Sequence, residues 1–273
     1  MRWKPPGRSS ERVLIYGPPK VGKSKSVMDI ARAMYKQSGV WIIDTDEAWD
    51  RMLDGSDLPV REEWDHGERT EEWTSDEGVV LQRVGDWREY LDALERYAAG
   101  RKPGDWLLID SMTHPWQWVQ SFFIEQTHGG NLPEFLLERR TQAIKEKKHD
   151  PGMPPVEYQF INAMWFKMID TVLRGRSHVV VTAEASSLNP REDARVQEMF
   201  GSVGMKPQTQ KGLAFGVHSI LLAHHERKGT RERFMMTTVG ERGERDVKLE
   251  GTEIGDFWRD YMKAAGWKRS RTA

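Results

Sequence analysis

Residues 17–24 read GPPKVGKS and match the pattern G-x-x-x-x-G-K-[ST] at every position. A short apolar run at 13–16 precedes the match, and a segment with helical spacing of its apolar residues, 23–35, follows it. In such a strand–loop–helix unit the glycines let the backbone curl so that successive N–H groups point inward, and the helix N-terminus adds partial positive charge. The match therefore predicts a loop that binds phosphate groups, set in an α/β fold.

The residues of this loop have predicted roles in binding a nucleotide, with ATP and Mg²⁺ as the expected ligands. Lys23 is expected to reach the β- and γ-phosphates, and the Ser24 hydroxyl is expected to be a ligand of Mg²⁺. The backbone N–H of Lys25 is expected to meet the α-phosphate at the start of the helix. The predicted nucleotide-binding residues are Gly17, Pro18, Pro19, Lys20, Val21, Gly22, Lys23, Ser24 and Lys25.

A carboxylate follows a second apolar run, WLLID at 106–110. Four apolar residues before an Asp are typical of the tip of a buried strand, and a nucleotide site of this kind needs such a carboxylate for the magnesium shell. Asp110 is therefore the predicted magnesium residue, together with Ser24. An Asp at a strand end also commonly caps a helix or forms a turn, so the prediction depends on its pairing with the loop.

Attack of water on the γ-phosphate needs an acceptor that orients or deprotonates the water. Asp46 and Glu47 follow the apolar run that ends in WIID and are the candidates, and the sequence leaves the choice between them open. Glu184 ends the run HVVVTAE and is a candidate sensor of the γ-phosphate or its water. All three also fit exposed acidic turns. The predicted catalytic residues are thus Lys23, Asp46, Glu47 and Glu184.

The composition narrows the class of protein. The 273 residues include no cysteine, which excludes disulfides, thiolate metal sites and a cysteine nucleophile. No apolar run approaches the roughly 20 residues of a membrane span, so a cytoplasmic protein without membrane contact is expected. The formal net charge is −1, so any contact with nucleic acid must come from local basic patches such as those within 139–148 and 227–233.

Strand-like and helix-like runs alternate along the chain. This alternation predicts a mostly parallel central sheet flanked by helices, with antiparallel strands near the C-terminus. One domain is expected at 11–267, with a surface insertion at about 50–78, a flexible lead at 1–10 and a flexible tail at 268–273. Beyond the elements already named, strands are predicted at 40–43, 79–84, 178–182, 218–223 and 233–239, helices at 87–98, 158–174 and 257–267, and irregular segments at 112–135, 139–155 and 185–210.

With these residues in place, the chain resembles the RecA-like recombinase ATPases, specifically the single-domain versions carried by bacteriophages and associated with single-strand annealing. IIDTDEAWD at 42–50 is similar to the segment that carries the family's catalytic acid, which assigns that role to Asp46. LLIDS at 107–111 looks like the family's magnesium strand. VVVTAE at 179–184 takes the place of a strand that ends in Asn-Gln in the family. The resemblance spans about residues 11–250.

This resemblance implies a RecA-like P-loop NTPase core that hydrolyses ATP under stimulation by DNA. It implies a homo-oligomer with the nucleotide at the subunit interface, acting on single-stranded DNA in recombination, repair or annealing, with a single-strand-binding or annealing protein as a further partner. DNA-binding loops are implied at about 139–157 and 185–211. The residue that reaches the neighbouring subunit's nucleotide is implied to be Lys211, Lys206 or Arg242.

Other interpretations stay open. A nucleotide or small-molecule kinase uses the same loop, with arginines at 139 and 140 or at 191 and 195 in a lid, and a DNA packaging or assembly motor subunit is a third reading. An aromatic group at helical spacing either stacks on bases or belongs to the core, and the spacing favours the core. This group consists of Tyr158, Phe160, Trp165 and Phe166.

Overall fold

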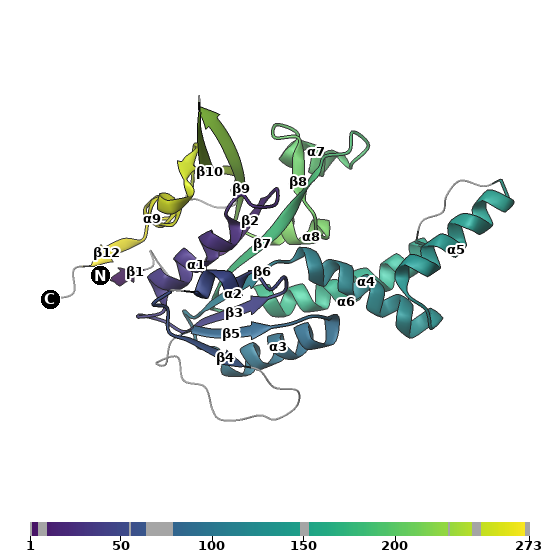
Figure 1. Cartoon of the computed structure of the whole chain (residues 1–273), viewed down its shortest axis with the longest axis horizontal. Coiled ribbons are helices and arrows are strands. Elements are labelled where there is room, and N and C mark those ends of the chain that lie inside the picture. Colours follow the sequence, from purple (N-terminus) through teal and green to yellow (C-terminus); the bar gives the residue numbers. More distant parts are fainter. Residues whose placement is uncertain are drawn as a thin grey trace.

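The computed structural model describes residues 2–4, 10–54, 56–63, 79–147, 153–228, 230–241 and 247–270. Strands and helices alternate through most of this length (Figure 1). The strands are β1 (Arg2–Lys4), β2 (Arg12–Gly17), β3 (Val40–Asp44), β4 (Val60–Glu63), β5 (Val79–Arg83), β6 (Trp106–Asp110), β7 (His178–Ser187), β8 (Met205–Pro207), β9 (Ser219–Lys228), β10 (Arg231–Glu241), β11 (Thr252–Glu253) and β12 (Lys268–Ser270). The helices are α1 (Lys23–Met34), α2 (Trp49–Leu53), α3 (Trp87–Gly100), α4 (Thr113–His128), α5 (Leu132–Lys145), α6 (Pro155–Leu173), α7 (Ala194–Phe200), α8 (Lys211–Gly216) and α9 (Ile254–Ala264).

A ten-stranded mixed sheet forms the centre of the molecule, in the order β11-β10-β9-β2-β7-β6-β3-β5-β4, with β8 paired to β7. All neighbours from β9 to β4 run parallel, whereas β10 and β11 join antiparallel to the strand before them. This arrangement confirms the predicted α/β class, with a mostly parallel sheet and antiparallel C-terminal strands. Within the described ranges, none of the helices combines the length and the apolar character that a membrane crossing requires.

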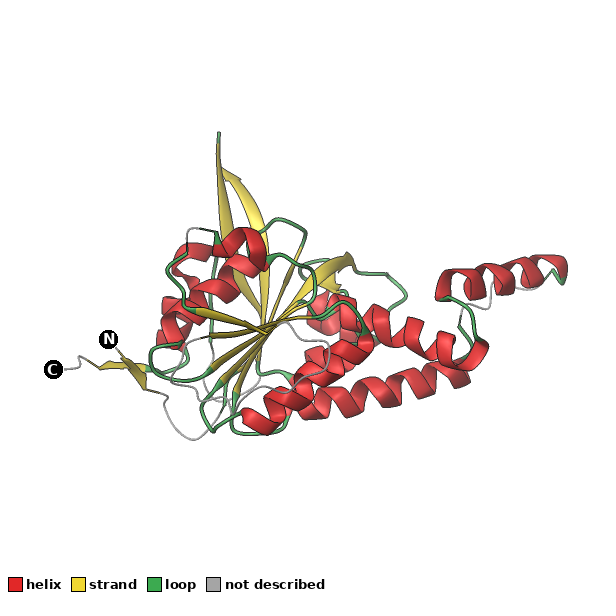
Figure 2. Ribbon diagram, turned by 60° about the horizontal axis from the view of Figure 1, so that its bottom comes forward, coloured by secondary structure: helices red, strands yellow, loops and turns green. Residues whose placement is uncertain are grey.

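Helices cover both faces of the sheet, as the view along the fan of strands in Figure 2 shows. Alternate residues of each strand enter two separate cores because successive side chains of a strand point to opposite faces. Val13 and Ile15 of β2 pack with α1 and α9 on one face, while Leu14 and Tyr16 pack with α3, α4 and α6 on the other. Burial on both faces explains why β2, β3 and β6 read as continuous apolar runs.

The prediction of irregular structure is wrong over most of 112–135 and over the first part of 139–155, because α4 and α5 occupy 113–128 and 132–145. Gly129 ends α4 in the left-handed conformation, and the Asn131 side chain accepts the backbone N–H of Glu134 at the start of α5. Ala143 is the buried residue of α5, so this helix has almost no apolar stripe facing a core. A helix of this kind gives a weak periodic signal in the sequence.

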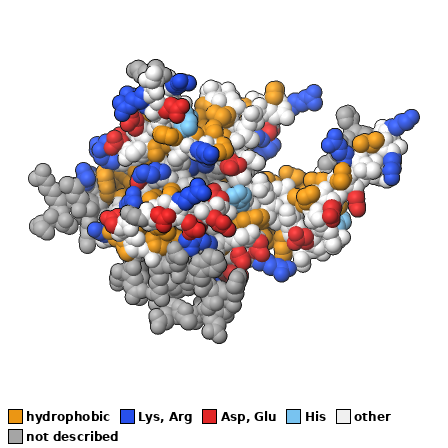
Figure 3. Space-filling model, in the orientation of Figure 1, with side chains coloured by type: hydrophobic (Ala, Val, Ile, Leu, Met, Phe, Trp, Pro, Cys, Tyr) orange, Lys and Arg blue, Asp and Glu red, His pale blue; other side chains and the backbone are white. Residues whose placement is uncertain are grey.

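The arm formed by α4, α5 and the start of α6 projects from the body of the molecule (Figures 1 and 2). Hydrophobic side chains follow the arm in the space-filling view, with Lys and Arg side chains at its outer end (Figure 3). Among the described residues, seven of the eight exposed large hydrophobic side chains belong to α5 and α6. Such a concentration is typical of interaction surfaces. The seven are Leu136, Leu137, Ile144, Val156, Tyr158, Phe160 and Phe166.

The two ends of the described chain pair with each other. β1 and β12 form a separate antiparallel sheet in which Trp3 lies opposite Arg269. The sequence analysis predicted flexible ends at 1–10 and 268–273 and did not anticipate this pairing. In the predicted insertion at about 50–78, the structure has the end of α2 and strand β4 at the edge of the sheet, while residues 55 and 64–78 lie outside the described residues.

Candidate functional site

The GPPKVGKS loop joins β2 to α1 at the carboxyl end of the central sheet. β2 lies between two parallel neighbours, β7 and β9. The crevice outside the carboxyl ends of parallel strands is where open α/β sheets generally bind ligands. The position of the loop therefore agrees with its predicted role as a binding element.

Glycine is required at two positions of the loop. A Cβ on Gly17 would stand 2.2 Å from the backbone oxygen of Ala223 in β9, so only glycine fits this close approach. Gly22 has a φ of 93°, in the left-handed region that glycine adopts without strain, and it is the residue before α1. No side chain caps this helix and its first turn has no acidic residue, so the positive end of the helix dipole faces the loop.

Lys23 folds back over the loop that precedes it. Its Nζ donates to the carbonyl oxygens of Gly17 at 3.0 Å and Pro18 at 2.8 Å. Burial lowers the pKa of Lys23, and the negative charges of Asp110, Glu184 and Asp46 act in the opposite direction. The structure thus brings together four residues that the sequence predicted separately.

Asp110 ends β6 and is 1% exposed. Burial raises its pKa, as does the charge of Asp46, whereas the hydroxyl groups of Thr182 and Ser24 and the charge of Lys23 lower it. The Thr182 hydroxyl donates to Oδ1, while Oδ2 is buried and accepts no hydrogen bond. A buried carboxylate oxygen without a donor is costly unless it gains a partner.

The predicted magnesium residues fit a divalent cation. Ser24 and Asp110 face each other, and Oδ2 of Asp110 has an unused lone pair beside the loop. Within the described ranges, no group of three or more His, Asp or Glu side chains forms a protein-only metal site. Mg²⁺ bound together with a nucleotide needs just one or two protein oxygens, because phosphates and water supply the others.

Asp46 and Glu47 lie in an exposed turn after β3, but they differ in their relation to the site. Asp46 is one of the charges that act on Lys23 and on Asp110, and its Oδ1 accepts the backbone N–H of Ala48 at 3.2 Å. Glu47 has a φ of 57° and is not among the charges that act on either group. The geometry therefore favours Asp46 over Glu47 as the carboxylate of this turn that belongs to the site.

Asp44 is a site residue that the sequence analysis passed over. It pairs in register with Asp110 across β3 and β6 and is 1% exposed. Its carboxylate accepts the backbone N–H groups of Asp46 and Trp49, both at 3.3 Å. Burial, with a smaller contribution from the charges of Asp110 and Asp46, raises the pKa of Asp44 to about 7. The sequence does contain a signal for Asp44, because WIID is an apolar run followed by Asp, as is WLLID.

Short hydrogen-bonded links hold the ends of β3, β6 and β7 in place. Thr45 Oγ1 accepts the backbone N–H of Ser111 at 2.7 Å and donates to the carbonyl of Ser111 at 2.9 Å. The Glu184 backbone N–H donates to Thr113 Oγ1 at 2.9 Å. His114 Nδ1 lies 3.3 Å from Thr45 Oγ1. Isolated threonines and a histidine give no sequence pattern, so these links were not predicted.

The two segments expected to be DNA-binding loops are mostly regular structure. α5 and the start of α6 occupy much of 139–157, and β7, α7, β8 and the start of α8 occupy much of 185–211. Trp165 is fully buried, which confirms the core reading for that residue. Phe160, Phe166 and Tyr158 are 58%, 44% and 38% exposed, so the expectation that the whole group belongs to the core is wrong.

The candidates for a residue acting on a neighbouring subunit are engaged within this chain or lie outside the described residues. Lys206 forms an ion pair with Glu192. Lys211 Nζ lies 3.0 Å from Asp193 Oδ2 and 3.6 Å from Glu192 Oε2. Arg242 lies outside the described residues.

Comparison of the sequence with protein-family models and with curated proteins gives no match. The functional assignment therefore depends on the geometry of the site and on the chemistry of its residues.

Proposed function

We propose that this chain is an ATPase with a RecA-like P-loop core, which binds ATP and Mg²⁺ at the GPPKVGKS loop and hydrolyses ATP. The observation that carries the proposal is the grouping of Lys23, Ser24 and Asp110 between the loop and the strand ends. The same residue types, in the same strand–loop–helix setting, serve phosphate and magnesium binding in P-loop NTPases.

Lys23 supplies the positive charge for the terminal phosphates. Its ammonium group exchanges the carbonyl oxygens of Gly17 and Pro18 for phosphate oxygens, which are stronger acceptors because they are charged. Gly22 and the N-terminus of α1 direct backbone N–H groups at the same phosphates.

Ser24 and Asp110 would hold Mg²⁺, which supplies charge neutralisation on the β- and γ-phosphates when bound. Thr182 fixes the Asp110 carboxylate by donating to Oδ1, which leaves Oδ2 for the metal shell. Asp46 orients the attacking water in this proposal, and Glu184 senses the γ-phosphate, because both carboxylates face Lys23.

The DNA part of the proposal comes from the resemblance to phage RecA-like recombinases. We propose that a homo-oligomer, with the nucleotide at the subunit interface, acts on single-stranded DNA in recombination, repair or annealing in the host cytoplasm. Three exposed aromatic side chains on α6 support this, since stacking on aromatic rings is the general way to bind single strands. A single-strand-binding or annealing protein is the proposed partner. The three side chains are those of Tyr158, Phe160 and Phe166.

A nucleotide or small-molecule kinase is the main alternative, and a packaging or assembly motor subunit is the second. The kinase needs an arginine-bearing lid over the phosphates. Arg139 and Arg140 belong to α5, and this helix projects away from the body of the molecule (Figure 1). This position disfavours the kinase reading based on that pair.

Steady-state ATP hydrolysis by the full chain tests the proposal. Lys23→Ala is expected to lower kcat by about two orders of magnitude or more, because it removes the positive charge that stabilises the transferring phosphoryl group. Lys36→Ala, at an exposed lysine in the turn just after α1, is the matched control and is expected to keep full turnover. Undiminished hydrolysis by Lys23→Ala contradicts the assignment of the loop.

Adding single-stranded DNA or nucleoside monophosphates to the same assay separates the two main readings. The recombinase reading predicts faster ATP turnover with single-stranded DNA and no phosphorylated product from monophosphates. Formation of nucleoside diphosphate from an added monophosphate supports the kinase reading instead.

A further inference from the structure

A cavity of about 470 Å³ opens beside the GPPKVGKS loop, on the side of β2 where β9 and β10 lie. Asp110 belongs to the other side of β2, beyond β7. The loop residues Gly22 and Lys25 form one wall, the start of β10 forms a second and the start of α9 forms the third. The volume lies within the 300–1,000 Å³ that is typical of small-molecule sites.

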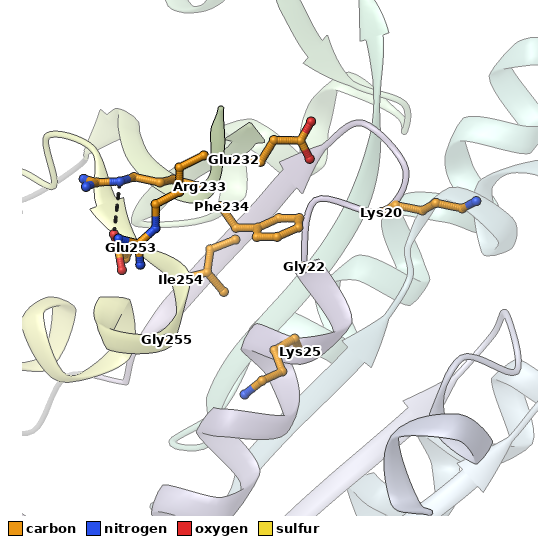
Figure 4. A pocket seen from close by; sticks show the side chains of 10 residues that line it. Lys20, Gly22, Lys25, Glu232, Arg233, Phe234, Glu253, Ile254 and Gly255 are labelled. Carbon is orange, nitrogen blue, oxygen red and sulfur yellow. Dashed lines mark ion pairs between the residues drawn. The ribbon is translucent and has the colours of Figure 1, made fainter. Parts of the chain in front are cut away.

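Phe234 and Ile254 form the apolar part of this cavity. Figure 4 shows the Phe234 ring extending from the β10 hairpin toward Gly22, with Ile254 beside it. Phe234 is 43% exposed, and it is the one exposed large hydrophobic side chain among the described residues that does not belong to α5 or α6. Ile254 is 5% exposed and packs so close that a Cβ on Gly22 would stand 3.2 Å from its Cδ1. Phe234 thus has one open ring surface above a rigid apolar floor.

The polar lining consists of long charged side chains. Arg233 Nε lies 3.6 Å from Glu253 Oε1, and this pair borders the cavity (Figure 4). Arg233 Nε is buried and has no hydrogen-bond acceptor. Lys25 is exposed and pairs with Asp29 along its own helix. Both signs of charge are therefore available at the rim, so donors and acceptors on a ligand can both find partners.

We infer that this cavity takes the base and sugar of a purine nucleoside triphosphate, with the base stacked on Phe234. The inference rests on the proposed function, because the phosphates must occupy the loop for the nucleoside to reach the cavity wall at Lys25. A purine covers more of the Phe234 ring than a pyrimidine does, and the larger apolar area removed from water favours the purine. Strong selection between adenine and guanine needs buried polar groups that the wrong base leaves unpaired. Arg233 Nε faces Glu253, and the other charged groups of the described lining are solvated Lys, Arg and Glu side chains, so ATP and GTP bind alike.

Isothermal titration calorimetry on the full chain, with Mg²⁺, tests the inference. The ligands are ATP, GTP, CTP, UTP and inorganic tripolyphosphate, which has the phosphates without base or sugar. The unaltered chain is expected to bind ATP and GTP within about threefold of each other and the pyrimidine nucleotides several-fold more weakly. Phe234→Ala is expected to weaken ATP and GTP binding about tenfold and to leave tripolyphosphate binding unchanged.

Two further variants keep the result interpretable. Phe234→Trp retains a stacking surface and is expected to retain purine affinity, which separates stacking from a general disturbance of the hairpin. Leu137→Ala removes another exposed apolar side chain, from α5, and is expected to bind every ligand as before.

The failure of this inference is distinguishable from failure of the proposed function. If Phe234→Ala binds ATP as tightly as the unaltered chain, or if ATP and GTP differ more than tenfold, the cavity assignment is overturned while nucleotide binding at the loop stands. If neither tripolyphosphate nor any nucleotide binds, the proposed function is overturned and the cavity assignment with it. Weaker binding of tripolyphosphate and ATP together by Phe234→Ala also overturns the assignment.

Discussion

Three aspartates lie at one edge of the sheet in different surroundings. Asp110 is buried with one unused oxygen, Asp44 is buried with both oxygens occupied by backbone N–H groups, and Asp46 is exposed. Environment rather than residue type separates their roles. Asp110 suits a metal shell, Asp44 fixes the turn that carries Asp46, and Asp46 is accessible to water.

The roles of the carboxylates can be separated by amide variants. Asp46→Asn is expected to keep ATP affinity within about threefold and to lower kcat about 100-fold or more, because an amide cannot accept the proton of the attacking water. Glu47→Gln is expected to retain most turnover, since Glu47 is not among the charges on Lys23 or Asp110. Single-turnover hydrolysis and nucleotide binding measured side by side provide the check. Loss of turnover in Glu47→Gln alone would assign the role to Glu47.

Asp44 makes stability depend on pH in a defined window. Its pKa rises from 3.8 in the unfolded chain to about 7 in the fold, so the folded state retains a proton that the unfolded state has lost. The free energy of unfolding therefore falls as the pH rises from about 4 to about 7, by about 3 kcal/mol between pH 5 and pH 8. Asp44→Asn cannot ionise and is expected to reduce this fall. Urea unfolding of both chains at the two pH values measures it, and equal falls contradict the assignment.

Some residues of the candidate site could be predicted from the sequence and others could not. The loop was recognised because its glycines and its lysine occur at fixed spacing, and Asp110 because an apolar run precedes it. Thr45, Thr113 and Thr182 support the site through contacts with residues that lie 60 or more positions away in the chain. Examples are the hydrogen bond between Ser111 and Thr45 and the one between Thr182 and Asp110. Such contacts depend on strand order, which a local pattern does not contain.

At the scale of elements, the spacing of apolar residues predicted the helices that bury an apolar stripe and the strands that are buried on both faces of the sheet. β2, α1, β6 and α9 agree with the prediction to within a few residues. α5 was missed because it buries almost nothing. The short strands β1, β8, β11 and β12 have two or three residues each and are defined by pairing partners, which local sequence does not disclose.

The buried carboxylate of Glu11, which directly precedes β2, accepts hydrogen bonds from α9 and from the segment that follows α9. Glu11 is 3% exposed and accepts hydrogen bonds from Tyr261 Oη at 3.0 Å and Trp267 Nε1 at 2.8 Å. Glu11→Ala leaves both buried donors without this acceptor and is expected to lower the free energy of unfolding by about 3 kcal/mol. Glu125→Ala, at an exposed position on α4, is the control and is expected to change it by less than about 0.5 kcal/mol. Equal midpoints in urea for all three chains would show that the Glu11 contacts add no stability.

At the scale of the whole molecule, β2 separates the two parts of the proposed nucleotide site. β2 carries the loop, with β7 and the buried aspartates on one side and β9, β10 and the cavity on the other. In the proposed function the phosphates and their chemistry belong to the first side and the nucleoside to the second. α9 packs against α1 and supplies Ile254 to the cavity, so the C-terminal helix links the loop to the antiparallel strands.

The pairing of β1 with β12 sets the two ends of the described chain next to each other. A short linker could therefore join residues near these two strands, and new ends could be opened where the chain is exposed. A circular permutant that joins the old ends by a short linker and opens between Gly129 and Gly130, in the exposed turn after α4, is expected to refold with unchanged far-ultraviolet circular dichroism. One opened between Val27 and Met28, inside buried α1, is expected to remain unfolded.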